Sequence, residues 1–199
     1  MSVTAADVKA LRDRTGAGMM ECKGALQESG GDVDKAIDIL RVRGQAKAAK
    51  RGEREAAEGV VADYVHFNGR VGAIVEVDCE TDFVARNEDF LAFARDVAIH
   101  IASAAPRWVS EDDVPEEERE RELAILEQQA DESKPPEVRR KISEGRLRKW
   151  LEEVVLLNQK HVNADKHESR TIEELRAEIS SKTSENVVIR RFARFAVGE

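Results

Sequence analysis

The chain is organised around the run CETDFVARN, residues 79–87, which lies between two different hydrophobic patterns. Before it, Val60 to Val77 is rich in β-branched residues and contains a turn signal, which predicts a β-hairpin. After it, from Glu88, apolar residues recur at intervals of three or four, which predicts an amphipathic helix. The run is therefore a strand-to-helix connection, and its capping residues Thr81 and Asp82 predict a helix start within it.

Two large apolar residues, Phe83 and Val84, stand where such a connection normally becomes polar. In one interpretation Phe83 is a hydrophobic staple that folds back on its own helix. In the other it is a wedge presented to a partner protein. The residue pattern taken alone favours the staple.

The rest of residues 58–199 predicts an α+β domain. Asn68 and Gly69 separate the two hairpin strands and are the pair most typical of a two-residue type I′ turn. The stretch 186–197 alternates apolar and basic residues, which predicts a third strand. We expect a small antiparallel sheet with helices packed on one face.

The N-terminal part predicts three short helices with tight glycine turns, a mini-bundle over residues 1–44 whose third helix ends near Gly44. Residues 45–57, rich in alanine and charged residues, predict a linker helix. Met19 and Met20 follow the Gly16–Gly18 turn, and the pattern alone favours core positions for them. The turn lacks the remaining residues of a phosphate-binding loop.

Composition excludes several classes of protein. The 199 residues carry a net charge of −8 and only 5% aromatic residues, which disfavours a nucleic-acid-binding surface. Cys22 and Cys79, the only cysteines, lie far apart and outside any metal-ligand spacing, which indicates a reducing compartment. The sequence has no apolar run of membrane-spanning length and no signal core, so we expect a cytoplasmic protein.

Three classes of function remain to be weighed. The sequence has no recognisable nucleophile motif, zinc spacing or phosphate loop, so we expect no enzyme and no cofactor or metal. A binding protein, such as a non-catalytic helical adaptor, fits the pattern better. A helix-turn-helix nucleic-acid-binding protein built on the N-terminal bundle is the third class, and the acidic balance counts against it.

Two motifs add a family resemblance. The run at residues 79–87 resembles a signature of bacterial translation elongation factor Ts, and LRDRTGAGMMECK at residues 11–23 resembles the N-terminal signature of the same family. The motifs occur in the right order, and the resemblance covers nearly the whole chain. It implies a UBA-like (ubiquitin-associated-like) three-helix domain and a guanine nucleotide exchange factor for elongation factor Tu.

The resemblance also implies roles for individual residues. The motif for Mg²⁺ displacement and exchange would be Thr81, Asp82, Phe83 and Val84. The N-terminal bundle would grip the partner through Arg12, Met19 and Met20. His100 lies in a His-Ile-Ala-Ser run that resembles a family segment near the interface, and it is expected to be either packed or partner-facing.

The chain resembles the compact branch of that family, since it has one predicted sheet unit. A single unit leaves an apolar sheet face to be covered. We therefore expect a homodimer and a two-plus-two complex with the partner. Some compact relatives have a cysteine at the position of Ala193, so a disulfide between subunits at that position is impossible here.

Overall fold

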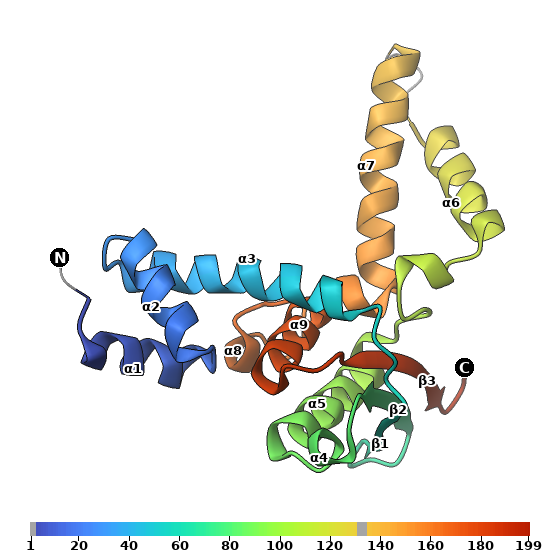
Figure 1. Cartoon of the computed structure of the whole chain (residues 1–199). Helices are drawn as coiled ribbons and strands as arrows, with labels where there is room; N and C mark the ends of the chain where they lie inside the picture. Colours follow the sequence, from blue (N-terminus) through green and yellow to red (C-terminus); the bar gives the residue numbers. More distant parts are fainter. Residues whose placement is uncertain (1–2, 131–134) are drawn as a thin grey trace. The chain divides into compact units, whose positions relative to one another are not determined.

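The computed structural model describes residues 3–130 and 135–199, and it begins with a helical bundle (Figure 1). The bundle comprises α1 (Ala5–Thr15), α2 (Met19–Glu28) and α3 (Val33–Arg51). Thr4 and Asp7 form a reciprocal capping box at the start of α1, and Gly16 ends this helix in the left-handed conformation that favours glycine. Asp32 caps α3 by accepting hydrogen bonds from the backbone amides of residues 34 and 35.

The bundle has a small hydrophobic core of its own. Its buried members come from all three helices: Val8, Leu11, Cys22, Ala25, Leu26, Ala36 and Leu40. The three predicted helices are therefore present and pack together.

The third helix is longer than predicted. We expected it to end near Gly44 and a separate linker helix to follow, but α3 runs without interruption to Arg51. A glycine inside a helix costs only about 1 kcal/mol relative to alanine. The alanine- and lysine-rich residues that follow favour the helix and offset that cost, so residues 45–51 continue α3.

The residues that follow the bundle form the predicted antiparallel sheet. Its strands are β1 (Glu58–Val65), β2 (Val71–Cys79) and β3 (Val188–Ala196), in the order β1-β2-β3. β2 is central, and its residues Ala73, Val75 and Val77 are buried. The α+β fold class predicted from the sequence is confirmed.

The turn between β1 and β2 lies where Asn68 and Gly69 predicted it, but its type differs. The amide of Gly69 donates to the carbonyl of His66 at 2.7 Å, and the amide of His66 donates to the carbonyl of Val71 at 2.8 Å. Four residues, 67–70, therefore lie between the paired positions. Gly69 has φ of +65°, whereas Asn68 has no positive φ, so the type I′ prediction is wrong.

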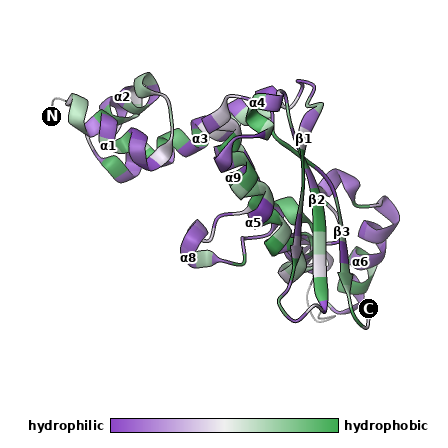
Figure 2. Ribbon diagram, turned by 90° about the horizontal axis from the view of Figure 1, so that it is seen from below, coloured by the Kyte–Doolittle hydropathy of each residue, from purple (hydrophilic) through white to green (hydrophobic). Residues whose placement is uncertain are grey.

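Helices complete the domain. They are α4 (Asp82–Ala85), α5 (Glu88–Ala104), α6 (Glu116–Gln128), α7 (Pro136–Val154), α8 (Ala164–His167) and α9 (Ile172–Thr183), with 3₁₀ helices η1 (Glu111–Asp113) and η2 (Leu156–Asn158). β2 and α5 both carry many hydrophobic residues (Figure 2). Phe90, Val97 and Ile101 on α5 are fully buried. The guanidinium of Arg194 on β3 donates to the carbonyl of Ala102 at 3.1 Å, which ties this helix to the sheet.

The contacts divide the chain into two compact units, each built from distant stretches of sequence. The first joins residues 1–61, 76–94 and 174–189. The second joins residues 62–75, 95–173 and 190–199. The N-terminal bundle and the run at residues 79–87 belong to the first unit, and His100 belongs to the second. Within the described ranges, no helix has both the length and the apolar character that a membrane crossing needs.

Candidate functional site

The run at residues 79–87 forms a short helix with a cap at its start, and a second cap begins the helix that follows. Thr81 is the N-cap of α4, and its hydroxyl accepts a hydrogen bond from the amide of Val84 at 3.4 Å. Asn87 then caps α5, because its side-chain carbonyl accepts from the amides of Asp89 and Phe90 at 2.9 and 3.3 Å. Two capping residues six positions apart thus fix where the chain enters and leaves the turn.

Phe83 points into solvent from this turn. Its side chain is 82% exposed, although it is one of the largest apolar residues in the chain. A staple would be buried against its own helix, so the staple interpretation is wrong. The exposed aromatic ring is available to a partner protein, where burial of such a ring contributes binding free energy.

Asp82 and Arg86 flank the exposed ring with opposite charges. The carboxylate of Asp82 lies 3.2 Å from the guanidinium of Arg86, one helical turn further on. Both side chains are largely accessible, so the pair contributes little to stability. The Asp82 carboxylate is therefore held at the surface and can exchange Arg86 for a group on another molecule.

The base of the turn is held by a residue that sequence reasoning missed. The carboxylate of Glu185 accepts hydrogen bonds from the amides of Glu80 and Thr81 at 3.0 and 3.1 Å. It also accepts from the hydroxyl of Thr81 at 2.6 Å. No local signal in the sequence identifies Glu185, because its partners lie more than one hundred positions earlier in the chain.

A second set of hydrogen bonds joins the same two segments, but here Glu80 supplies the acceptor carboxylate. The carboxylate of Glu80 accepts from the amide of Asn186 at 2.6 Å and from the guanidinium of Arg54 at 3.3 Å. The side-chain Nδ2 of Asn186 donates to the carbonyl of Arg54 at 2.8 Å. Residues 54, 80–81 and 185–186 therefore form one hydrogen-bonded junction beneath the exposed turn.

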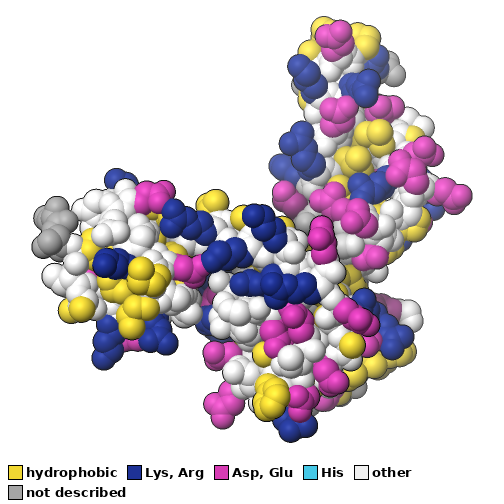
Figure 3. Space-filling model, viewed as in Figure 1, with side chains coloured by type: hydrophobic (Ala, Val, Ile, Leu, Met, Phe, Trp, Pro, Cys, Tyr) yellow, Lys and Arg dark blue, Asp and Glu magenta, His cyan; other side chains and the backbone are white. Residues whose placement is uncertain are grey.

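The N-terminal motif presents a second exposed apolar surface. Met19 and Met20, at the start of α2, are 52% and 76% exposed, so the core positions favoured by the pattern are wrong. Arg12 on α1 is also exposed. Figure 3 shows hydrophobic side chains gathered on the face of the bundle that is turned toward the viewer. Methionine adapts its shape to different partners, which suits a protein-binding surface.

His100 has no exposed surface. It is packed inside the second unit, where its Nε2 lies 2.8 Å from Oε1 of Gln159 and its Nδ1 accepts from the amide of Val162 at 3.2 Å. Because an amide can only donate, Nδ1 carries no proton and the ring is the neutral Nε2–H tautomer. Burial lowers the pKa of His100 to about 4. Of the two expected positions the structure has the packed one, and the side chain does not reach the surface.

The described residues contain no group of histidine, cysteine or acidic side chains arranged to hold a metal ion. Both cysteines are buried and unpaired. Burial, together with the nearby Glu185 carboxylate, raises the pKa of the Cys79 thiol to about 11. Cys79 therefore stays a protonated thiol that donates to the carbonyl of Thr81 at 3.2 Å.

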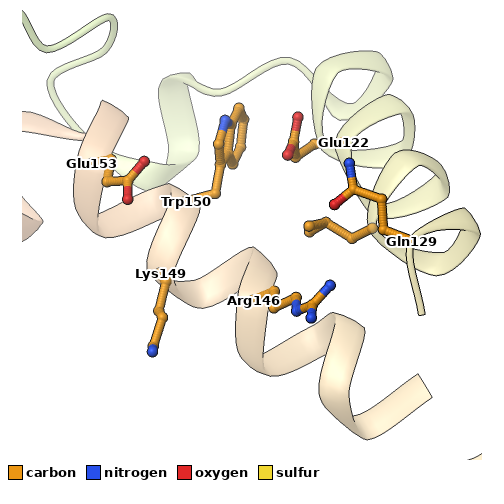
Figure 4. Close-up of a pocket in the computed structure, with 7 residues that line it drawn as sticks. Glu122, Gln129, Arg146, Lys149, Trp150 and Glu153 are labelled. Carbon is orange, nitrogen blue, oxygen red and sulfur yellow. The ribbon is translucent and has the colours of Figure 1, made fainter. Parts of the chain in front are cut away.

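A cavity of about 410 Å³ opens between α6 and α7 (Figure 4). Leu126 and Trp150 supply its apolar surface. Acidic side chains such as Glu122 and basic ones such as Arg146 line it together, so the cavity has no preference for one sign of charge.

Fold and site together define a class of protein. Phe83 is exposed on a capped turn flanked by charged residues, and Met19 and Met20 are exposed at the start of α2. Such an arrangement suits a protein that binds another protein through a few anchoring side chains.

Comparison with known proteins identifies the family. The family model described as "Elongation factor TS" matches residues 33–199. Elongation factor Ts of Thermosipho melanesiensis is 50% identical over 198 residues, which cover 99% of this chain and 100% of that protein. Elongation factor Ts of Desulfitobacterium hafniense is 53% identical over 198 residues (99% and 90%), and that of Rubrobacter xylanophilus is 54% identical over 189 residues (94% and 95%). The chain belongs to the elongation factor Ts family.

Proposed function

We propose that this protein is a guanine nucleotide exchange factor for elongation factor Tu, a GTPase of translation elongation. It binds the GDP-loaded GTPase, displaces Mg²⁺ and promotes GDP release so that GTP can bind. The observation that carries this proposal is the 82% exposure of Phe83 on a capped turn, in a chain that belongs to the elongation factor Ts family.

Exchange follows from where the turn enters the partner. A GTPase holds its nucleotide through Mg²⁺, which bridges the phosphates, and through backbone amides around them. Asp82 and Phe83 enter the nucleotide-binding domain and disturb the side chains that hold Mg²⁺ and the phosphate-binding loop. Thr81 and Val84 are half-buried, and they hold the turn that presents the other two.

The energy for exchange comes from binding, so no covalent chemistry is required. The factor binds the nucleotide-free conformation of the GTPase better than the loaded one. Because coupling between two ligands is reciprocal, the factor weakens nucleotide binding by the same ratio as the nucleotide weakens binding of the factor. Fresh GTP then expels the factor and completes the cycle.

The N-terminal bundle supplies a second grip. Arg12, Met19 and Met20 contact the partner from the bundle of residues 1–44, and their exposure supports this role. The bundle contributes affinity, whereas the turn contributes the change in nucleotide binding. His100 acts indirectly, through the packing of α5, since its side chain is buried.

The protein acts in the cytoplasm as a homodimer, in a two-plus-two complex with its partner. One face of the sheet supports the dimer, because apolar side chains on all three strands are exposed there: Val65, Ile74 and Phe195. Apolar side chains gathered on one sheet face are typical of an interface. Ala193 on β3 rules out a disulfide at its own position only.

The test is release of a fluorescent GDP analogue from elongation factor Tu, followed by stopped flow. We expect the wild-type protein to accelerate release, and Asp82→Ala and Phe83→Ala to accelerate it less. Phe67→Ala is the matched control, because Phe67 is an equally exposed phenylalanine, 92% accessible, on the β1–β2 turn. A folded wild-type protein that does not accelerate release would refute the proposed function.

A further inference from the structure

The junction lies beneath the turn at residues 79–87, the exchange turn. It contains more hydrogen bonds to one side chain than closing a loop requires. A single carboxylate, that of Glu185, accepts three hydrogen bonds from two adjacent residues, Glu80 and Thr81. Hydrogen bonds to an ionised acceptor are stronger than neutral ones. Two of the three come from backbone amides, so they fix the path of the chain as well as one side chain.

The hydroxyl of Thr81 links Glu185 to the exposed turn. A hydroxyl has one proton to donate, and that of Thr81 is donated to Glu185 at 2.6 Å. The lone pairs of the same oxygen are thereby turned toward the amide of Val84, from which it accepts at 3.4 Å. The hydroxyl that caps α4 is therefore the same group that is bonded to Glu185.

The segment that carries Glu185 is itself held in place. Ser184 has φ of +62°, in the left-handed region that favours glycine, and such strained positions persist only where surrounding contacts hold them. The hydroxyl of Ser180 donates to the carbonyl of Glu185 at 2.6 Å. The amide of Glu185 donates to the hydroxyl of Thr183 at 3.4 Å, and the amide of Asn186 is bonded to Glu80, so the segment is held on both sides of Glu185.

We propose that Glu185 is a positioning residue for nucleotide exchange. It does not touch the partner's nucleotide site. It holds residues 80–81 so that Asp82 and Phe83 are already oriented before the partner binds, which lowers the ordering cost of inserting the turn into the partner's nucleotide site. This inference rests on the proposed exchange function and adds a residue to it.

The test uses Glu185→Gln, which keeps the size of the side chain but removes its charge and one of its two acceptor oxygens. We expect the maximal rate of GDP release to fall by on the order of tenfold. We expect the concentration of factor that gives half of this rate to change little, because the N-terminal bundle still binds. Glu178→Gln is the matched control, since Glu178 lies on the neighbouring helix α9 and pairs with Lys182.

A double-mutant cycle separates positioning from a general structural role. If Glu185 acts by orienting Phe83, Glu185→Gln reduces the rate much less when Phe83 is already alanine. Equal reductions in both backgrounds, or a wild-type rate for Glu185→Gln, would overturn the proposal.

Hydrogen exchange of the free protein supplies a readout that is independent of activity. In Glu185→Gln the amides of Glu80, Thr81 and Val84 are expected to exchange faster, while the amides of the bundle core are unchanged. Unchanged protection of these three amides would overturn the proposal even if the exchange function held. If these amides exchange faster in Glu185→Gln but the wild-type protein does not accelerate GDP release, the proposed exchange function is wrong. The positioning role, which rests on that function, is then wrong as well.

Discussion

Phe83 is exposed to solvent on a turn that is capped at its start and followed directly by a second capped helix. Burying one phenylalanine contributes roughly 1.5–3 kcal/mol. We therefore predict that Phe83→Ala slows GDP release by roughly tenfold to somewhat over a hundredfold without abolishing it, at about 1.4 kcal/mol per decade. Stopped-flow release from elongation factor Tu measures this. Complete loss of exchange with normal binding would contradict a mechanism distributed over several contacts.

The residues of the exchange turn show how far sequence reasoning reaches. Thr81 was identified as a helix cap from its type and position, and it is one. The orientation of Phe83 was not predictable from the pattern, because a staple and a wedge have the same spacing. Glu185 was missed because hydrogen bonds between residues 104 positions apart leave no periodic signal. Local chemistry predicts caps, whereas burial and long-range partners require the fold.

Gly59 on β1 lies so close to the backbone of β2 that a side chain has no room there, which the sequence pattern did not indicate. A Cβ atom at Gly59 would lie 2.4 Å from the carbonyl oxygen of Val77. Gly59→Ala therefore forces the two strands apart, and we expect it to lower the free energy of unfolding by about 1–3 kcal/mol. Urea denaturation measures the loss.

Gly145→Ala is the matched control for this prediction. Gly145 lies within α7, and a Cβ atom there would meet nothing within 4 Å. Alanine in a helix interior is more favourable than glycine by about 0.5–1 kcal/mol, so this variant is expected to be more stable than the wild type. A Gly59→Ala variant as stable as Gly145→Ala would show that the hairpin adapts to the added methyl group.

The histidines around α5 make stability depend on pH. Burial lowers the pKa values of His100, His161 and His167, and that of His100 falls from 6.5 to about 4. The unfolded chain therefore binds more protons between these values than the folded one. The contribution of these buried neutral histidines to the free energy of unfolding is fully present above pH 6.5 and is lost as the pH falls toward 4. For His100 this loss is at most about 3 kcal/mol.

Thermal unfolding at pH 7, 6 and 5 tests this dependence. We expect the melting temperature to fall with pH, and His100→Gln to reduce the slope because glutamine does not titrate. A slope unchanged by His100→Gln would assign the dependence to other groups, such as His161, which lies 5.3 Å from His100 between ring centres.

The boundaries of the elements were predicted less well than their existence. The three strands and the bundle helices were found from hydrophobic spacing. The prediction that the third helix ends near Gly44 is wrong. The low helix propensity of one glycine costs little compared with the favourable propensities of the residues that follow it. Asn68 and Gly69 gave the position of the turn, but the pairing of His66 with Val71 sets a longer loop.

At the scale of the whole molecule, the exposed sheet face predicts association. We expect light scattering at micromolar concentration to report a dimer, and Phe195→Asp to shift it to monomer, because a charge cannot be buried there without a partner. Val42→Asp is the control, since Val42 is similarly exposed but belongs to helix α3 and is not part of the sheet. A monomeric wild-type protein would contradict the homodimer.

The bond between Thr81 and Glu185 also sets an order of events during protein synthesis. A ribosome makes the chain from its N-terminus, so the exchange turn leaves the ribosome long before Glu185, 104 positions later, has been added. Until then the turn lacks the hydrogen bonds that Glu185 accepts from Glu80 and Thr81. A growing or truncated chain that lacks Glu185 would therefore be a poor competitor for the GTPase, and full activity appears only after Glu185 has also left the ribosome.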